Sequence, residues 1–338
     1  MKRIAAGFAV LLGAAAFTPV AMAGDVDTAF KINGFVDASY SDADSGDGTF
    51  SLDQVEIDVQ KKINGKLGVR ADINYLSTGV STFDELVEQG YVTYDLAVGN
   101  GATFTFGKFN APIGFELLDP VDMYQFSHSL VFDNGLPTNL TGVMGSYAFT
   151  DMFDASVYVV NGWDNNADNN AGKTVGGRLG ITPVSGVNLG LSVISGTMET
   201  TATTGDRRTV FDADLTVTLV ERLTVGAELN IGNEERASLA VSGEDAKWTS
   251  YLVMAHYDFT DWLGLTARYD YFDDRGGTRL GNSMREREKS YTVAPTVALG
   301  DGAGLLAEYR RDESSENVYG TVPDDTKDTF AVEFTYSF

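Results

Sequence analysis

The chain ends in the stretch Asp328-Thr329-Phe330-Ala331-Val332-Glu333-Phe334-Thr335-Tyr336-Ser337-Phe338. Large apolar side chains occupy every second position from Phe330 to Phe338, and small or polar side chains occupy the positions between them. Because side chains of a β-strand point alternately to its two faces, this spacing predicts a strand with one wholly apolar face and one polar face.

The same alternation recurs along the whole chain. We count sixteen such segments, near residues 29–40, 51–60, 67–75, 86–95, 102–109, 140–149, 153–161, 174–182, 187–195, 209–219, 223–231, 248–259, 262–272, 290–299, 304–311 and 328–338. The links after even-numbered segments are short, whereas those after odd-numbered segments are mostly longer and more polar. An antiparallel meander with all short turns at one end and all long loops at the other produces this rhythm, as in a bacterial outer-membrane barrel.

A soluble β-sandwich or β-solenoid is the alternative fold, since its strands also alternate. Large aromatic residues near the strand ends of the apolar faces instead favour the girdles of a membrane barrel; they include Tyr75, Phe149, Phe153, Tyr257, Trp262, Tyr291 and Phe338. We therefore predict an all-β fold, a transmembrane antiparallel up-and-down β-barrel of about 16 strands. A barrel of that size encloses an aqueous channel, whereas eight strands would leave only a filled interior.

The N-terminus has the features of a secretory signal peptide. Lys2 and Arg3 precede the apolar run Ile4–Phe17, and Ala21-Met22-Ala23 matches a cleavage site. We expect residues 1–23 to be removed and residues 24–338 to form the barrel. No later run of apolar residues approaches the 18 that a transmembrane helix needs.

Composition excludes several classes of function. A formal net charge of −24 argues against nucleic acid as a partner, and the absence of cysteine excludes disulfides and thiolate sites. The stretch Asp42–Gly48 resembles a calcium loop but has Gly46 at the third ligand position and Asp53 instead of glutamate at the twelfth. His128 and His256 accompany no recognisable nucleophile motif. We expect no catalytic, cofactor or metal site, and no enzyme activity.

Two regions, one at residues 107–116 and one at residues 161–176, carry most of a family resemblance. Residues 107–116 read Gly-Lys-Phe-Asn-Ala-Pro-Ile-Gly-Phe-Glu, and Asn161-Gly162-Trp163-Asp164-Asn165 follows, with Asp168–Gly176 after it. Together with Glu308–Asp312, these residues resemble the OmpL-like β-barrel porins of Gram-negative bacteria, most strongly from about residue 85 to residue 180 and at the C-terminus. The resemblance implies a channel in the outer membrane and names no substrate.

The longest link, residues 110–139, is the third external loop of the predicted barrel. It is rich in apolar residues, and loops of this length are usually functional or disordered. We expect it to fold into the lumen and narrow the pore. Acidic loop residues facing basic wall residues would then set a transverse field that selects ions by sign; the candidates are Glu116, Asp119, Asp122, Arg70, Arg178, Arg268 and Arg310. The alternatives are an external cap and wall arginines that merely pair with neighbouring acids.

The sequence thus predicts a passive diffusion channel for small hydrophilic solutes or ions, with a mild preference for cations. A substrate-selective porin with a binding constriction and a non-conducting surface-interaction barrel stay open as alternatives. The expected partners are outer-membrane lipid, lipopolysaccharide and the barrel assembly machinery, for which the terminal Phe338 is the signal. A homotrimer is an open alternative, and the transported solute is not predicted.

Overall fold

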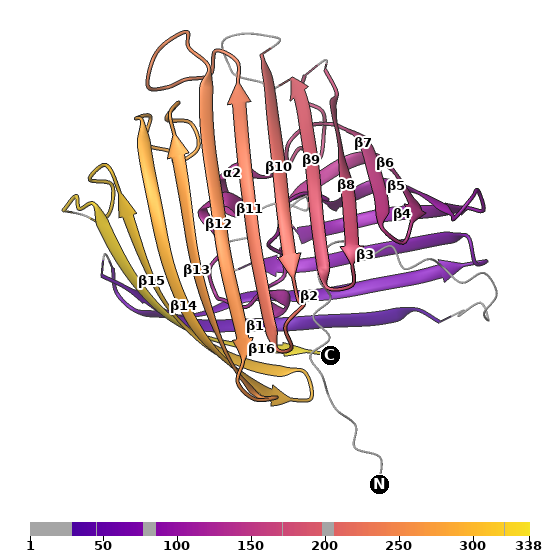
Figure 1. Cartoon of the computed structure of the whole chain (residues 1–338), viewed down its shortest axis with the longest axis horizontal. Helices are drawn as coiled ribbons and strands as arrows, with labels where there is room; N and C mark the ends of the chain where they lie inside the picture. Colours follow the sequence, from indigo (N-terminus) through magenta and orange to yellow (C-terminus); the bar gives the residue numbers. More distant parts are fainter. Residues whose placement is uncertain (1–28, 45, 77–85, 171, 198–205, 321) are drawn as a thin grey trace.

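The computed structural model describes residues 29–338 except 45, 77–85, 171, 198–205 and 321. Its strands form one closed antiparallel barrel in which each strand pairs with its chain neighbours and β1 pairs with β16 (Figure 1). The strands are β1 (Lys31–Ala43), β2 (Thr49–Ile63), β3 (Leu67–Leu76), β4 (Val87–Leu96), β5 (Ala102–Asn110), β6 (Asn139–Thr150), β7 (Phe153–Val160), β8 (Thr174–Val184), β9 (Val187–Thr197), β10 (Arg207–Val217), β11 (Leu223–Glu234), β12 (Ala246–Asp258), β13 (Leu263–Asp274), β14 (Glu286–Gly300), β15 (Ala303–Ser314) and β16 (Thr326–Ser337).

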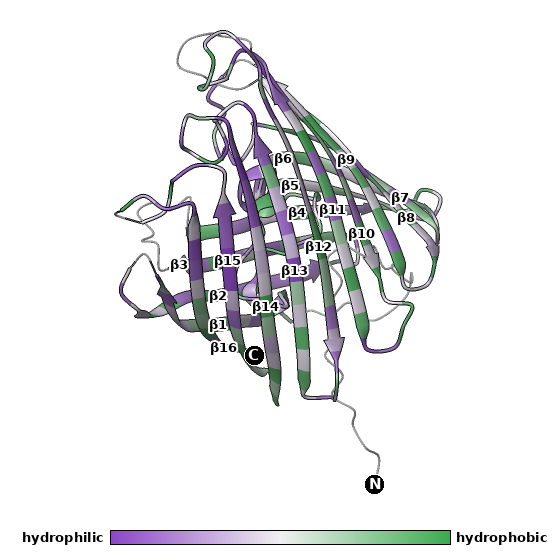
Figure 2. Ribbon diagram, turned by 60° about the vertical axis from the view of Figure 1, so that its left-hand side comes forward, coloured by the Kyte–Doolittle hydropathy of each residue, from purple (hydrophilic) through white to green (hydrophobic). Residues whose placement is uncertain are grey.

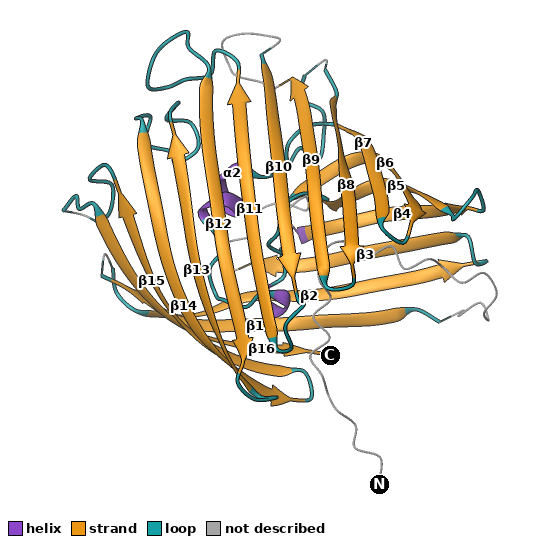
Figure 3. Ribbon diagram, in the orientation of Figure 1, coloured by secondary structure: helices purple, strands orange, loops and turns teal. Residues whose placement is uncertain are grey.

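Two short helices lie between β5 and β6, namely η1 (Pro120–Asp122) and α2 (Leu130–Gly135) (Figure 3). No helix in the described part of the chain is long and apolar enough to cross a membrane. The predicted sixteen-strand barrel is confirmed, and the strand bounds differ from the predicted segments by only a few residues.

Closure of the sheet satisfies the backbone. The first and last strands pair from Phe35 opposite Ser337 to Ala43 opposite Thr329, so that neither strand is an open edge. Hydrocarbon cannot hydrogen-bond an unpaired backbone group, and a spanning sheet must therefore close on itself. The short turns use residues suited to positive φ: Asn64 and Gly65, with φ of 48° and 71°, connect β2 to β3.

The two faces of the wall follow the alternation of the sequence. Outward side chains such as Ile57, Val157 and Leu229 are exposed, whereas their polar neighbours Glu56, Ser156 and Glu228 are buried on the inner side. Figure 2 shows hydrophobic residues gathered toward the short-turn ends of β13–β15 and hydrophilic residues toward the loop ends. The predicted girdle aromatics are among the exposed side chains. The exposed apolar surface thus forms the lipid-facing outside of the barrel.

Candidate functional site

The link between β5 and β6, residues 111–138, lies against the inner wall; we call it the inner loop. Its helix α2 packs against β11, β12, β13 and β14, and its helix η1 lies near β1 and β16. Figure 3 shows α2 behind the strands of the front wall, within the barrel outline. The inner loop therefore reaches β1 and β16, the two strands that close the barrel. It also reaches β11–β14, on the wall opposite β5 and β6.

Apolar contacts explain part of this docking. Several inward positions near the loop ends of β5–β13 carry apolar side chains instead of polar ones, namely Phe109, Leu140, Tyr158, Val160, Ile194, Val210, Trp248 and Phe272. Ile113, Leu130 and Leu136 of the inner loop pack into this cluster. Val131 joins Leu252 and Met254 in a second cluster. Burial of apolar surface, worth about 25 cal/mol per Å², drives the loop onto the wall.

A buried ion pair fixes the middle of the inner loop. Arg268 on β13 donates from Nη1 to Oε1 of Glu116 at 2.8 Å, and both side chains are almost fully buried. Oε2 of Glu116 accepts the backbone N–H of Ser129 at 2.8 Å, and Gln125 donates to Oε1 at 2.9 Å. Burial raises the pKa of Glu116, but the Arg268 charge and the Ser129 hydrogen bonds outweigh it and hold the pKa below its usual value. Glu116 is thus a charged anchor.

Further wall side chains hold the backbone of the inner loop. Carboxylates of Asp270, Glu228 and Glu308 accept backbone N–H groups of Leu130, Phe115 and Ser127, at 2.7, 2.9 and 3.1 Å. The guanidinium groups of Arg310 and Arg279 donate to backbone carbonyls of His128 and Asn134, at 2.7 and 2.6 Å. These groups lie on β11, β13, β15 and the β13–β14 link. Charged donors and acceptors make the stronger class of hydrogen bond, so this side of the lumen holds the loop firmly.

The arginines expected to line the pore all have carboxylate partners. Arg70 pairs with Asp72 at 2.8 Å, Arg178 with Asp214, and Arg310 with Asp312 at 2.7 Å, in addition to the Arg268–Glu116 pair. Two of the four predicted arginines, Arg268 and Arg310, also bind the inner loop. Arg70, Arg178 and Arg310 thus pair with acids of the wall, whereas Arg268 pairs with an acid of the inner loop.

Asp119 and Asp122, at the two ends of η1, face a different wall. Asp122 lies close enough to Asp58 and Arg70 for their charges to act on it. Burial and the nearby charges of Glu88, Asp122 and Asp58 raise the pKa of Asp119 to about 8. The acidic end of the inner loop therefore faces an acidic region of β2–β4 that includes Arg70.

Several inner carboxylates lack a basic partner in the described part of the chain. Glu56, Glu88, Asp37 and Glu333 are buried on the inner wall, and none of the ion pairs among the described residues includes them. The sequence analysis did not single out these four residues. The inward parity of Glu56, Asp37 and Glu333 was the available signal for these three, whereas Glu88 departs from that alternation.

The terminal residue lies at the seam. Phe338 exchanges two backbone hydrogen bonds with Gly34 of β1, at 3.0 and 3.2 Å. A Cβ at Gly34 would lie only 2.8 Å from the Phe338 ring and 2.3 Å from the Glu56 carbonyl oxygen. The absence of a side chain at residue 34 thus lets the aromatic ring cover the closure. Its role as an assembly signal stays a prediction.

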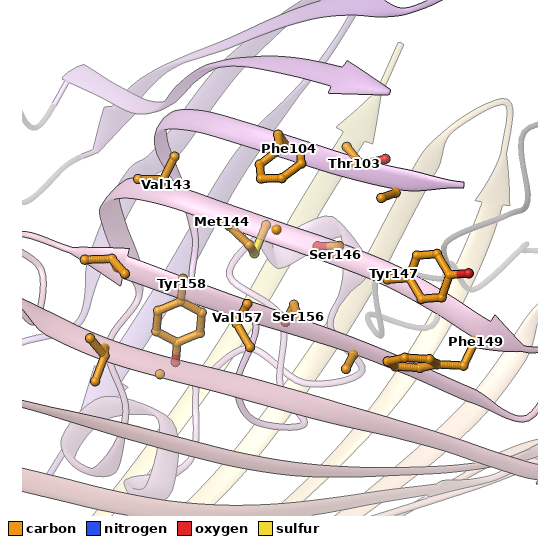
Figure 4. Close-up of a pocket in the computed structure, with 16 residues that line it drawn as sticks. Thr103, Phe104, Val143, Met144, Ser146, Tyr147, Phe149, Ser156, Val157 and Tyr158 are labelled. Atoms are coloured by element: carbon orange, nitrogen blue, oxygen red, sulfur yellow. The ribbon is translucent and has the colours of Figure 1, made fainter. Parts of the chain in front are cut away.

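A shallow apolar groove lies on the outer face over β5–β8 (Figure 4). Its floor includes the small residues Ala102, Gly145 and Ala155, and Phe104 and Val157 stand opposite Gly145 on the neighbouring strands. Tyr147 and Phe149 lie at its short-turn end, as the labelled side chains show. This part of the outside can admit a close-packed neighbour.

Solved outer-membrane proteins share this architecture at low sequence identity. The trimer form of OmpT from Vibrio cholerae aligns with a TM-score of 0.68 and 13% identity, covering 92% of this chain and 99% of that one. An anion-selective porin from Comamonas acidovorans gives 0.67 and 12%, covering 92% and 99%. OmpF of Salmonella typhi, in complex with daunomycin, gives 0.67 and 16%, covering 91% and 97%. At these identities the likeness shows the fold.

The sequence itself matches a family model over nearly its whole length. The model is described as "Putative beta-barrel porin-2, OmpL-like", and it matches residues 19–338. The match includes both motif regions that carried the resemblance. No curated protein sequence matches the chain.

Proposed function

Since this chain belongs to the putative β-barrel porin-2, OmpL-like family, we propose that its lumen is a passive diffusion channel for small hydrophilic solutes with a mild preference for cations. The protein is an outer-membrane porin, and its barrel lies in the outer membrane. The inner loop narrows the lumen by docking on the wall of β11–β15, and its helix η1 lies against the side of β1 and β16.

The excess of acidic over basic residues, 48 against 24, supports the proposed cation preference. Each of the four arginines considered above is neutralised by an acidic partner, whereas Glu56, Glu88, Asp37 and Glu333 have no basic partner among the described residues. A lumen with one sign of excess charge concentrates counter-ions and selects permeating ions by sign. The anion-selective Comamonas porin has the same fold, so the fold by itself leaves the sign open.

Single-channel recording in a planar bilayer tests this function. We expect stepwise conductance and, in a KCl gradient, a reversal potential of the sign given by K⁺ flow. A reversal potential set by Cl⁻ would contradict the cation preference, and an insulating bilayer with folded protein inserted would contradict the channel. Block by one class of solute would instead support the substrate-selective alternative. Absence of any conductance together with partner binding would support the surface-interaction alternative.

Four further assignments belong to this proposal. Residues 1–23 act as a signal peptide, although they lie outside the described residues. Outer-membrane lipid and lipopolysaccharide contact the exposed girdles, and the barrel assembly machinery reads the C-terminal strand. Three copies assemble through the groove over β5–β8, a proposal supported by the trimer form of the similar OmpT.

The fourth assignment is that the protein catalyses no reaction, a proposal that rests on the contacts of its two histidines. His128 stacks on Phe132 at 4.0 Å between ring centroids and contacts the Leu117 carbonyl oxygen at 2.8 Å. His256 lies between Thr266 and Asp258. These contacts leave neither ring positioned as the base of a serine nucleophile.

A further inference from the structure

Three acidic side chains from three consecutive strands meet on the inner wall. Glu56 of β2, Asp72 of β3 and Glu88 of β4 are all buried, and one carboxylate oxygen from each lies within 4.8 Å of the others. A Ca²⁺ ion binds oxygen ligands at about 2.3–2.6 Å, so two ligands on opposite sides of one ion are separated by roughly the same 4.8 Å. The three carboxylates are thus spaced to share one cation.

A β-bulge creates this arrangement. Asp72 pairs with Gln89, but the next residue, Ile73, pairs with Val87, which leaves Glu88 as an extra residue in β4. Glu88 and Gln89 are consecutive, yet both are buried on the inner wall. A bulge redirects a side chain in this way, and bulges are enriched next to functional sites. Regular alternation would have turned Glu88 toward lipid.

Several buried oxygen atoms in and around this cluster have no hydrogen-bond partner. Glu56 has no exposed surface, and neither of its carboxylate oxygens accepts a hydrogen bond within the described structure. Asn74, directly opposite Glu56 on β3, donates from Nδ2 to Glu88 at 2.8 Å but leaves its Oδ1 without a donor. Asp119 of the inner loop also has an unpartnered Oδ1 and is close enough to be affected by the charge of Glu88. Unpartnered buried oxygens are costly unless something else binds them.

The cluster's other contacts hold it in place and leave oxygens available. Asn74 and Asn110 donate to the two oxygens of Glu88, at 2.8 and 3.1 Å. Asp72 accepts from Arg70 at 2.8 and 2.9 Å and from Gln89 at 2.5 Å. Each carboxylate oxygen can accept twice, so these contacts orient the ligands without using all of their lone pairs. The Arg70 guanidinium supplies one positive charge, which is fewer than the number of acidic side chains around it.

We propose that Glu56, Asp72 and Glu88, with the Asn74 side-chain carbonyl, form a Ca²⁺ site on the inner wall, completed by Asp119 when the inner loop is docked. Ca²⁺ accepts six to eight carboxylate, carbonyl and water oxygens in flexible geometry, which suits this set better than the strict octahedron of Mg²⁺. The ion would connect the wall of β2–β4 to the inner loop, opposite the Arg268–Glu116 anchor. This inference concerns a bound ion and does not depend on the proposed selectivity.

Calcium binding to the folded protein in detergent tests the site. The protein is stripped with a chelator, and ⁴⁵Ca²⁺ binding is measured by equilibrium dialysis at constant KCl. We expect one tight site per chain. Glu56→Gln keeps the shape of the side chain but removes a charged ligand, and we expect it to weaken binding at least about tenfold.

Glu333→Gln is the matched control, because Glu333 is equally buried on the inner wall and also has two unpartnered oxygens, but lies outside the cluster. It should bind Ca²⁺ like the wild type. Heat-modifiable migration on a gel confirms that each variant is folded. If Glu56→Gln does not fold, Asp119→Asn leaves the strands unchanged and should still weaken binding. The proposal is overturned if the wild type has no tight site. It is also overturned if Glu56→Gln, or Asp119→Asn where Glu56→Gln does not fold, binds Ca²⁺ as the wild type does. Equal weakening of binding by Glu333→Gln would overturn it as well.

Discussion

At the scale of single residues, neutralised and unneutralised charges have different roles in this lumen. Arg268 and Glu116 are charged, buried and paired, and they join the inner loop to β13. Glu56 and Glu333 are equally buried but have no basic partner among the described residues. Removing a member of the first group should release the inner loop from the wall.

Glu116→Gln tests the first of these roles. The amide keeps the shape but turns one acceptor into a donor that faces Arg268 or the Ser129 N–H. Breaking a buried ion pair costs about 3–5 kcal/mol, which is ample to undock a loop. We expect larger and noisier single-channel conductance and faster proteolysis of the inner loop.

Asp261→Asn is the control for this change, since it breaks the exposed Arg222–Asp261 pair between the β10–β11 and β12–β13 turns. Exposed pairs contribute about 0–1 kcal/mol, so this variant should conduct like the wild type. Equal conductance and equal protease resistance in Glu116→Gln would show that the anchor is dispensable.

At the scale of elements, the strands were predictable and the docking of the inner loop was not. A period of two in side-chain polarity is visible in any single strand, so all sixteen strands follow from the sequence. The loop docks through residues that break this period, such as Trp248 and Phe272 on the inward parity. Such an apolar residue at a polar position signals a packing partner but does not say which segment supplies it.

The bulge in β4 escaped prediction for a related reason. Nothing in the local sequence of Glu88 and Gln89 distinguishes a bulge from a strand that starts one residue later. The spacing of Glu56, Asp72 and Glu88 depends on register across three strands, and parity alone does not fix register. The sequence analysis therefore expected no metal site.

We expect Asp119, the residue before η1, to make the ion selectivity of the channel depend on pH. Burial, with the charges of Glu88, Asp122 and Asp58, raises the pKa of Asp119 to about 8, so this carboxyl is mostly neutral at pH 7 and ionises as the pH rises through 8. Ionisation adds negative charge beside the β2–β4 wall. With chelator present, we expect the ratio of K⁺ to Cl⁻ permeability, taken from reversal potentials, to rise between pH 7 and pH 9.

Asp119→Asn should remove that rise and leave the value measured for wild type at pH 7. The same pKa shift bears on loop docking. The carboxyl of the undocked loop has the usual aspartate pKa of about 3.8, so docking is strongest below that pH and weakens progressively up to about pH 8. A permeability ratio that stays flat over this range in the wild type would contradict the assignment of Asp119 to the solute path.

At the scale of the whole molecule, the barrel depends on its seam. Phe338 pairs with Gly34 through the backbone, and its ring lies over the space left by the glycine. Phe338→Ala keeps the backbone pairing but exposes the seam, and we expect a lower yield of heat-modifiable, folded protein in outer membranes. Phe259→Ala is the control: its ring is 55% exposed, against 56% for Phe338, but it lies in the β12–β13 turn. Equal yields for the two variants would remove the special role of the terminal residue.

The groove over β5–β8 is the proposed contact between copies of the barrel. Its floor residue Gly145 stands between Phe104 and Val157 on the adjacent strands. A Cβ there would meet only the Phe104 ring, at an ordinary 3.7 Å, so a larger side chain is compatible with the fold. Gly145→Phe should fill the groove and convert trimers to monomers on native gels and in cross-linking.

Ala267→Phe enlarges an equally lipid-facing residue on β13, on another part of the outer surface, and should leave the trimer intact. Because each monomer encloses its own lumen, conductance per barrel should survive in both variants, and only the grouping of steps into threes should be lost in Gly145→Phe. Persistence of trimers in Gly145→Phe would place the contact between copies elsewhere on the barrel.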